Sequence, residues 1–140
     1  MKVGSAGAHV VDTDTLKIVR HWSDDEGGLL CVAVAGESGA VFAGSAHDGT
    51  IRRWNVPFSE DPLIWKTTPL RVNSLAATDR GETILCGEHT HYLLWDVTND
   101  TPMEKWSINR TRPERMVSSL GAALTPSGHR LLLAVRGGNQ

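Results

Sequence analysis

Short apolar runs, separated by clusters of Gly, Pro, Asp, Asn and Ser, dominate the hydrophobic pattern of this chain. No stretch repeats its apolar positions with the period of an amphipathic helix. Runs of this kind, rich in Val, Ile, Leu and Trp and bounded by turn residues, are typical of β-strands. The pattern therefore predicts an all-β fold.

Four strands are predicted between Leu29 and Lys66, over residues 29–34, 40–45, 50–56 and 63–66. Glu37-Ser38-Gly39 marks the first turn. Asp48-Gly49 marks the second, and this dipeptide is a strong signal for a two-residue hairpin loop. Prolines at 57 and 62 bracket the last connection. The segment is predicted to form an antiparallel four-stranded sheet.

The same order of strands and turns returns in a second segment, over residues 72–77, 83–87, 91–97 and 103–108. Gly39 and Gly81 are 42 residues apart, and Gly44 and Gly87 are 43 apart. Two landmarks with nearly one spacing indicate an internal repeat.

Partial copies of the repeat flank the two complete ones. Residues 2–5, 9–12 and 16–22 match the second, third and fourth strands, and Asp12 lies 43 residues before Asn55. Residues 117–125 and 130–135 match the first and second strands. The chain is therefore expected to hold two complete sheets and two partial ones.

The strand endings carry a family resemblance. Gly44 to Asn55 holds a tight turn followed by Arg53-Trp54-Asn55, and Leu93-Leu94-Trp95-Asp96 repeats that ending 41 residues later. This pattern resembles the WD40-repeat family. The resemblance implies a partial β-propeller of four-stranded antiparallel blades that covers nearly the whole chain. Its parts would be a partial blade (1–22), two blades (23–66 and 67–108) and a second partial blade (109–140).

Propellers close with about four to eight blades. We therefore expect the chain to be a segment of a larger propeller protein. Two alternatives stay open: several copies that complete a ring together, and a small atypical sheet protein. Trp65 and Trp106, on the predicted fourth strands, are expected to pack between blades rather than to lie exposed.

In WD40 blades a polar network joins an Asp in the second turn, a Trp on the third strand, a Ser or Thr on the second strand and a His before the first strand. The resemblance maps Asp48, Trp54 and Ser45 onto three of these positions, and His21 onto the fourth. The second repeat lacks an Asp in the corresponding turn. The network is therefore expected to be intact in the first blade alone.

The resemblance also implies that the loops before each first strand share one face with the second turns, and that this face binds peptides or proteins. The first such loop is acidic, with Asp24, Asp25 and Glu26. The last holds three arginines, Arg110, Arg112 and Arg115. These six residues are the candidate partner face, because arginine suits phosphate and carboxylate contacts.

Composition limits the remaining functions. The net charge of −2 provides no broad basic surface for nucleic acid or anionic lipid. Cys31 and Cys86 are expected to be free thiols in a reducing compartment, and no signal peptide or membrane span is recognised. The protein is thus expected to be cytoplasmic or nuclear.

Catalytic and metal-binding motifs are not found. Cys86, Glu88, His89 and His91 lie close in sequence, but a zinc site needs a second ligand pair at motif spacing. No nucleophile elbow, phosphate loop or dinucleotide fingerprint occurs. The sequence predicts a non-catalytic protein-interaction scaffold without metal or cofactor. A segment of an enzymatic or metal-binding propeller, and a self-assembling partial propeller, are the alternatives.

Overall fold

The protein is all-β, and its strands pair antiparallel. The structure, a computed structural model, describes residues 7–23, 28–55, 61–67, 71–88, 91–109 and 119–135. Twelve strands and no helix lie in these ranges. Across the same ranges there is thus no helix long and apolar enough to cross a membrane.

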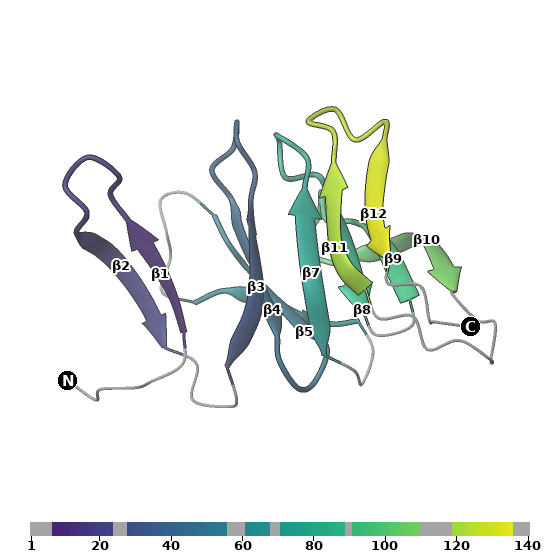
Figure 1. Ribbon diagram of the computed structural model, residues 1–140, viewed down its shortest axis with the longest axis horizontal. Helices are drawn as coiled ribbons and strands as arrows, with labels where there is room; N and C mark the ends of the chain where they lie inside the picture. The colour runs from purple at the N-terminus through teal and green to yellow at the C-terminus, as the bar shows by residue number, and fades with distance from the viewer. Residues whose placement is uncertain are drawn as a thin grey trace.

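Two four-stranded sheets form the centre of the molecule (Figure 1). The first sheet has the order β3-β4-β5-β6, with strands Leu29–Val34, Val41–Ser45, Thr50–Trp54 and Leu63–Lys66. The second sheet runs β7-β8-β9-β10, with strands Val72–Ala77, Thr83–Glu88, His91–Asp96 and Met103–Asn109. The prediction of an all-β fold with antiparallel four-stranded sheets is confirmed.

Two separate hairpins flank these sheets. The first hairpin joins β1 (Gly7–Val11) to β2 (Ile18–Ser23), and the last joins β11 (Ser119–Leu124) to β12 (Leu131–Val135). These strands fall within two residues of the predicted partial copies at 9–12, 16–22, 117–125 and 130–135. The expected strand at residues 2–5 lies outside the described residues.

The turns form where glycine permits a left-handed backbone. Gly49, in the β4–β5 turn, has a φ of 72°, and Gly81, in the β7–β8 turn, has a φ of 69°. An L-residue rarely adopts this conformation, so these positions favour glycine. Of the glycine landmarks of the sequence repeat, Gly39 (φ 72°) and Gly81 therefore mark chain reversals, whereas Gly44 and Gly87 lie within β4 and β8.

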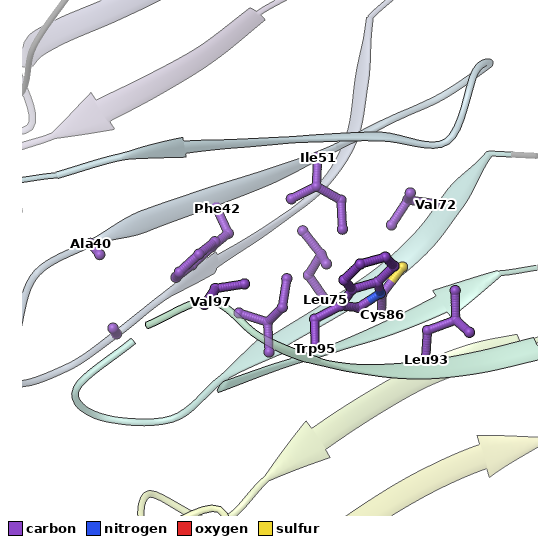
Figure 2. Close-up of a cluster of buried hydrophobic side chains, with 11 residues drawn as sticks. Ala40, Phe42, Ile51, Val72, Leu75, Cys86, Leu93, Trp95 and Val97 are labelled. Atoms are coloured by element: carbon purple, nitrogen blue, oxygen red, sulfur yellow. The ribbon is translucent and has the colours of Figure 1, made fainter. Parts of the chain in front are cut away.

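The main core lies between the two sheets, as Figure 2 shows. Phe42 and Ile51 from the first sheet are fully buried against Leu75, Cys86 and Trp95 from the second. Full burial of a side chain such as Phe42 contributes about 2 kcal/mol to folding. The sheets consequently stabilise each other face to face.

A second core joins the first hairpin to the opposite face of the first sheet. Ala8 and Trp22 from the hairpin pack on Val41, Ala43 and Trp54 from β4 and β5. The two hairpins and two sheets thus stack in chain order, as Figure 1 shows from the first hairpin at the left to the last at the right.

Arg53 adds a polar link inside the main core. Its side chain is 8% exposed, and its guanidinium donates through Nη1 to the Val97 carbonyl at 2.5 Å. Nη2 lies 3.5 Å from the exposed carboxylate of Asp100. The cation of the first sheet therefore takes a backbone acceptor from the second, as a buried charge requires.

The first strands of successive units lie side by side: β3 contacts β7, and β7 contacts β11 (Figure 1). Their turns are joined by backbone hydrogen bonds. Glu37 N–H and Ser38 N–H donate to the Asp79 carbonyl, and Asp79 N–H donates to the Pro126 carbonyl. These bonds form a turn ladder across three units and fix the spacing of their first strands.

The two tryptophans on the fourth strands differ. Trp65 packs against the main core, as predicted. Trp106 is 41% exposed, so the expectation that it packs between sheets is wrong. Trp106 lies on β10, the edge strand of the second sheet, whereas the last hairpin contacts β7 and β8 at the other side of that sheet.

Candidate functional site

The β4–β5 turn is organised by the two polar residues that the sequence singled out. Ser45 Oγ accepts hydrogen bonds from His47 N–H at 3.1 Å and Asp48 N–H at 3.3 Å. Asp48 Oδ1 accepts from Thr50 N–H at 3.1 Å and from the Thr50 hydroxyl at 2.8 Å. Hydrogen bonds from the side chains of Ser45 and then Thr50 lower the pKa of Asp48 to about 2. Ser45 and Asp48 are therefore brought together, and they stabilise the turn.

Trp54 is positioned by packing. Its side chain is 1% exposed and stacks on Trp22, with ring centroids 4.5 Å apart and planes at 22°. Its indole nitrogen finds no hydrogen-bond partner among the described residues. Trp54 thus joins the first sheet to the first hairpin through an aromatic contact rather than through a hydrogen bond to the turn.

His21 lies in β2, opposite His9 in the antiparallel register. The two imidazoles stack at 4.4 Å with an angle of 14°, on an exposed face of the first hairpin. The described contacts of His21 therefore connect the two strands of that hairpin. They do not bring its ring to Ser45 or Asp48.

The candidate partner face cannot be placed from this structure. Asp24, Asp25 and Glu26 lie outside the described residues, and so do Arg110, Arg112 and Arg115.

A buried carboxylate occupies the second sheet at the position of Ser45. Glu88 ends β8 as Ser45 ends β4, and it is fully buried. Its Oε1 lies 2.5 Å from the Thr67 hydroxyl, which is also 2.9 Å from the Gly49 carbonyl. Glu88 thus links the second sheet to the β4–β5 turn of the first. The sequence reasoning missed this role, although Glu88 follows Gly87 just as Ser45 follows Gly44.

A groove of about 600 Å³ lies where β2 meets β5 and β6. Cationic, aromatic and aliphatic side chains share its lining, which consists of Val19, Arg20, His21, Trp22, Arg52, Trp54, Pro62 and Ile64. The Arg20 guanidinium lies 5.9 Å above the Trp22 ring, within the range of a cation–π contact. Ile64 is 52% exposed. The groove thus offers guanidinium donors beside an apolar surface.

The two cysteine thiols contribute to packing of the core rather than to a reactive or metal-binding site. Cys31 and Cys86 are both free, and both belong to the main core. Burial raises the pKa of Cys31 to about 12, and burial followed by the nearby Glu88 raises that of Cys86 well above its ordinary value. Such thiols are poor nucleophiles, because the thiolate is the reactive form. In the part of the chain that the structure describes, no three His, Cys, Asp or Glu side chains group as metal ligands.

Comparison with models of known protein families gives no match for this sequence, and a search of curated proteins also finds none.

Proposed function

We propose that this chain is a non-catalytic protein-interaction module of the WD40 type, forming part of a larger β-propeller. Two observations support the fold. The four-stranded sheets repeat in one strand order, and their first strands β3, β7 and β11 lie side by side. Sheets of a propeller surround a central axis in this way.

The groove between β2 and the first sheet is the observation that carries the binding function. Arg20 and Arg52 supply guanidinium groups, which suit carboxylates because of their planar array of donors. Ile64, which is 52% exposed, supplies apolar surface in the same groove, above the buried Trp22 and Trp54 that line it. The partner proposed is therefore an acidic peptide segment that also carries an apolar side chain.

The fold suits such a role because the first hairpin and the first sheet hold both walls of the groove in place. Trp22 and Trp54 stack across the two walls, and the turn ladder fixes the neighbouring sheets. A preformed site loses less conformational entropy on binding than a flexible one.

The two free cysteines fit a reducing compartment, such as the cytoplasm or nucleus.

Selection from a random peptide display library tests the proposal. We expect the chain to enrich peptides that contain Asp or Glu beside an aliphatic or aromatic residue. Arg20→Glu reverses a charge in the groove and should weaken binding of an enriched peptide about tenfold or more. Fluorescence anisotropy of the labelled peptide measures the change.

Lys105→Glu is the matched control, because it makes the same charge change on an exposed β10 residue outside the groove. Its affinity should stay within about twofold of the unmodified chain. Equal losses of peptide affinity in the two variants would mean that net charge alone explains the effect, and would refute the groove as the binding site. Enrichment of basic or purely polar peptides would refute the partner chemistry.

A further inference from the structure

β6 is the outermost strand of the first sheet, and one of its edges is open to a further strand. Among the described residues it pairs with β5 alone, at the end of the order β3-β4-β5-β6. The Thr67 N–H, just after the strand, donates to the Gly49 carbonyl on the β5 side at 2.8 Å. Backbone groups of successive residues in a strand point alternately to its two sides. Ile64 and Lys66 therefore direct their N–H and C=O groups away from β5.

The side chains of the same two residues lie on the face of the groove. Ile64 pairs with Arg52, which lines the groove with it. Lys66 is two residues further along β6, so its side chain points to the same face. Trp65, between them, packs against the main core on the opposite face. Ile64 and Lys66 are both exposed. The open edge thus carries an aliphatic and a cationic side chain beside the groove.

β10, the outermost strand of the second sheet, is less suited to a further strand. Its register with β9 shifts between Glu104 and Trp106. A bulge of this kind interrupts the regular ladder, and natural edge strands use it to avoid pairing with other chains. The pairing of β5 with β6 runs without such a shift. A regular edge that borders the groove therefore distinguishes β6.

We propose that the partner's acidic peptide binds as an additional strand, antiparallel to β6, with its acidic residue two positions before its aliphatic residue. An added strand gains affinity from main-chain hydrogen bonds, and its alternate side chains provide specificity. This inference rests on the proposed function, because the partner is the one that the groove would bind. It adds the backbone conformation of that partner and the order of its side chains.

Hydrogen-bond geometry decides the direction of the added strand. Residues that face each other in an antiparallel pair can exchange both of their N–H···O=C bonds, and this pairing is slightly more stable per residue than the parallel one. Every strand pair that the structure describes is antiparallel. An antiparallel peptide passes Lys66 first and Ile64 two residues later.

The side chains on the groove face decide which residues suit these two positions. A carboxylate opposite Lys66 forms a cross-strand pair of opposite charge, and an aliphatic side chain opposite Ile64 removes apolar surface from water. Arg20 and Arg52 line the same groove and add positive charge near the carboxylate. The residue between the two points to the opposite face, so the groove does not select it.

A pair of synthetic peptides tests the order of the side chains. The probe is Thr-Asp-Thr-Ile-Thr with both ends capped, and the matched control is the reversed sequence Thr-Ile-Thr-Asp-Thr, which has the same composition. We expect the full chain to bind the probe at least about fivefold more tightly than the control. Fluorescence anisotropy of the labelled peptides measures both dissociation constants.

Methylation of single peptide nitrogens tests the main-chain hydrogen bonds without altering the protein. N-methylation of the probe's isoleucine removes the N–H that would donate to the Ile64 carbonyl, and it should weaken binding about tenfold or more. N-methylation of the central threonine is the control, because that N–H points away from β6. It should change the affinity by less than about threefold.

Two measurements on the protein locate the bound strand. When the probe occupies about nine-tenths of the chain, exchange of the Ile64 and Lys66 amides should slow about fivefold or more, and exchange of the β10 amides should not change. Lys66→Glu should prefer the probe with lysine in place of its aspartate. Lys105→Glu, on the exposed β10 strand, should keep the preference for aspartate.

Slower exchange at both amides, with a loss of affinity for isoleucine methylation alone, supports the proposal. Equal binding of the two peptide orders, equal effects of the two methylations, or unchanged exchange of Ile64 and Lys66 overturns it. If these tests fail while Arg20→Glu still weakens binding of the probe, the groove remains the binding site and only the added strand is refuted. If the tests succeed while Arg20→Glu has no effect, the added strand is supported and the role of the groove is refuted. A chain that binds neither peptide overturns both.

Discussion

Asp48 is a residue whose charge, rather than its bulk, stabilises the fold. Its carboxylate accepts the Thr50 amide and hydroxyl, and its pKa is lowered to about 2. Because the folded chain favours the charged form, this stabilisation is present above about pH 4 and is lost as the pH falls through about 2. Asp48→Asn keeps an acceptor but removes the charge. We expect it to cost about 1 kcal/mol at pH 7, after allowing for solvent screening.

Urea unfolding at several values between pH 7 and pH 2 measures this effect. The difference in free energy of unfolding between the unmodified chain and Asp48→Asn should shrink toward zero at the acid end. Asp14→Asn is the control, since that exposed carboxylate accepts no hydrogen bond from the described residues. A constant difference for Asp48→Asn would show that its carboxylate is not stabilised as described.

Individual residues were predictable where the cause of their role is local. Ser45 and Asp48 lie within three residues of each other and act on one turn, so the sequence could indicate them. Glu88 acts on Thr67, 21 residues away, through a contact that exists because two sheets stack. No local pattern carries that information. His21 was mapped by its place before a strand, whereas its ring contacts are decided by its partner across the hairpin.

The turns between the first two strands of each unit are the elements that hold neighbouring sheets in register. Asp79→Pro removes the N–H that donates to the Pro126 carbonyl. Proline already occupies the equivalent turn position at 126, so the backbone of this turn accepts it. Asp79→Ala removes the side chain and keeps the N–H. We expect Asp79→Pro to be less stable than Asp79→Ala by about 1 kcal/mol.

Thermal and urea unfolding of the two variants measure the difference. Exchange of the Glu37 amide, which donates to the Asp79 carbonyl, should be faster in Asp79→Pro, because the turn it binds is held less firmly. Equal stability of the two variants would mean that the hydrogen bond from Asp79 N–H to the Pro126 carbonyl stabilises the fold no more than a hydrogen bond from that N–H to water.

Strand positions were predictable because turn residues delimit each strand. The ranges 29–34, 63–66 and 72–77 were predicted without error, and most other ends differ by one or two residues. Which parts of each sheet face are covered by neighbouring strands could not be predicted. The continuous apolar run of β3 resembles a strand that is buried on both faces, yet Val32 is exposed, because exposure depends on which strands lie above it.

At the scale of the whole molecule, two sheets share one core and each contributes a thiol to it. Cys31 comes from the first sheet and Cys86 from the second. Burial raises the pKa of Cys31 to about 12 and raises that of Cys86 well above its ordinary range. Unfolding exposes both to water, where a thiol ionises near pH 8.5. Below that pH both states hold the protons equally. Above it the unfolded chain releases them while the folded chain does not, so stability falls until the folded pKa is reached.

The loss of stability should therefore lie between about pH 9 and pH 12, at up to about 1.4 kcal/mol per pH unit for each thiol. Urea unfolding at pH 8, 9 and 10 of the unmodified chain and of Cys31→Ala with Cys86→Ala checks this expectation. The double variant loses packing at every pH, so the informative quantity is the slope of stability against pH, which should be shallower. Each single variant should remove part of the slope, because one unfolding event exposes both thiols when the sheets part together. Parallel slopes for all chains would mean that the thiols reach solvent while the sheets remain paired, and that the two sheets do not unfold as one unit.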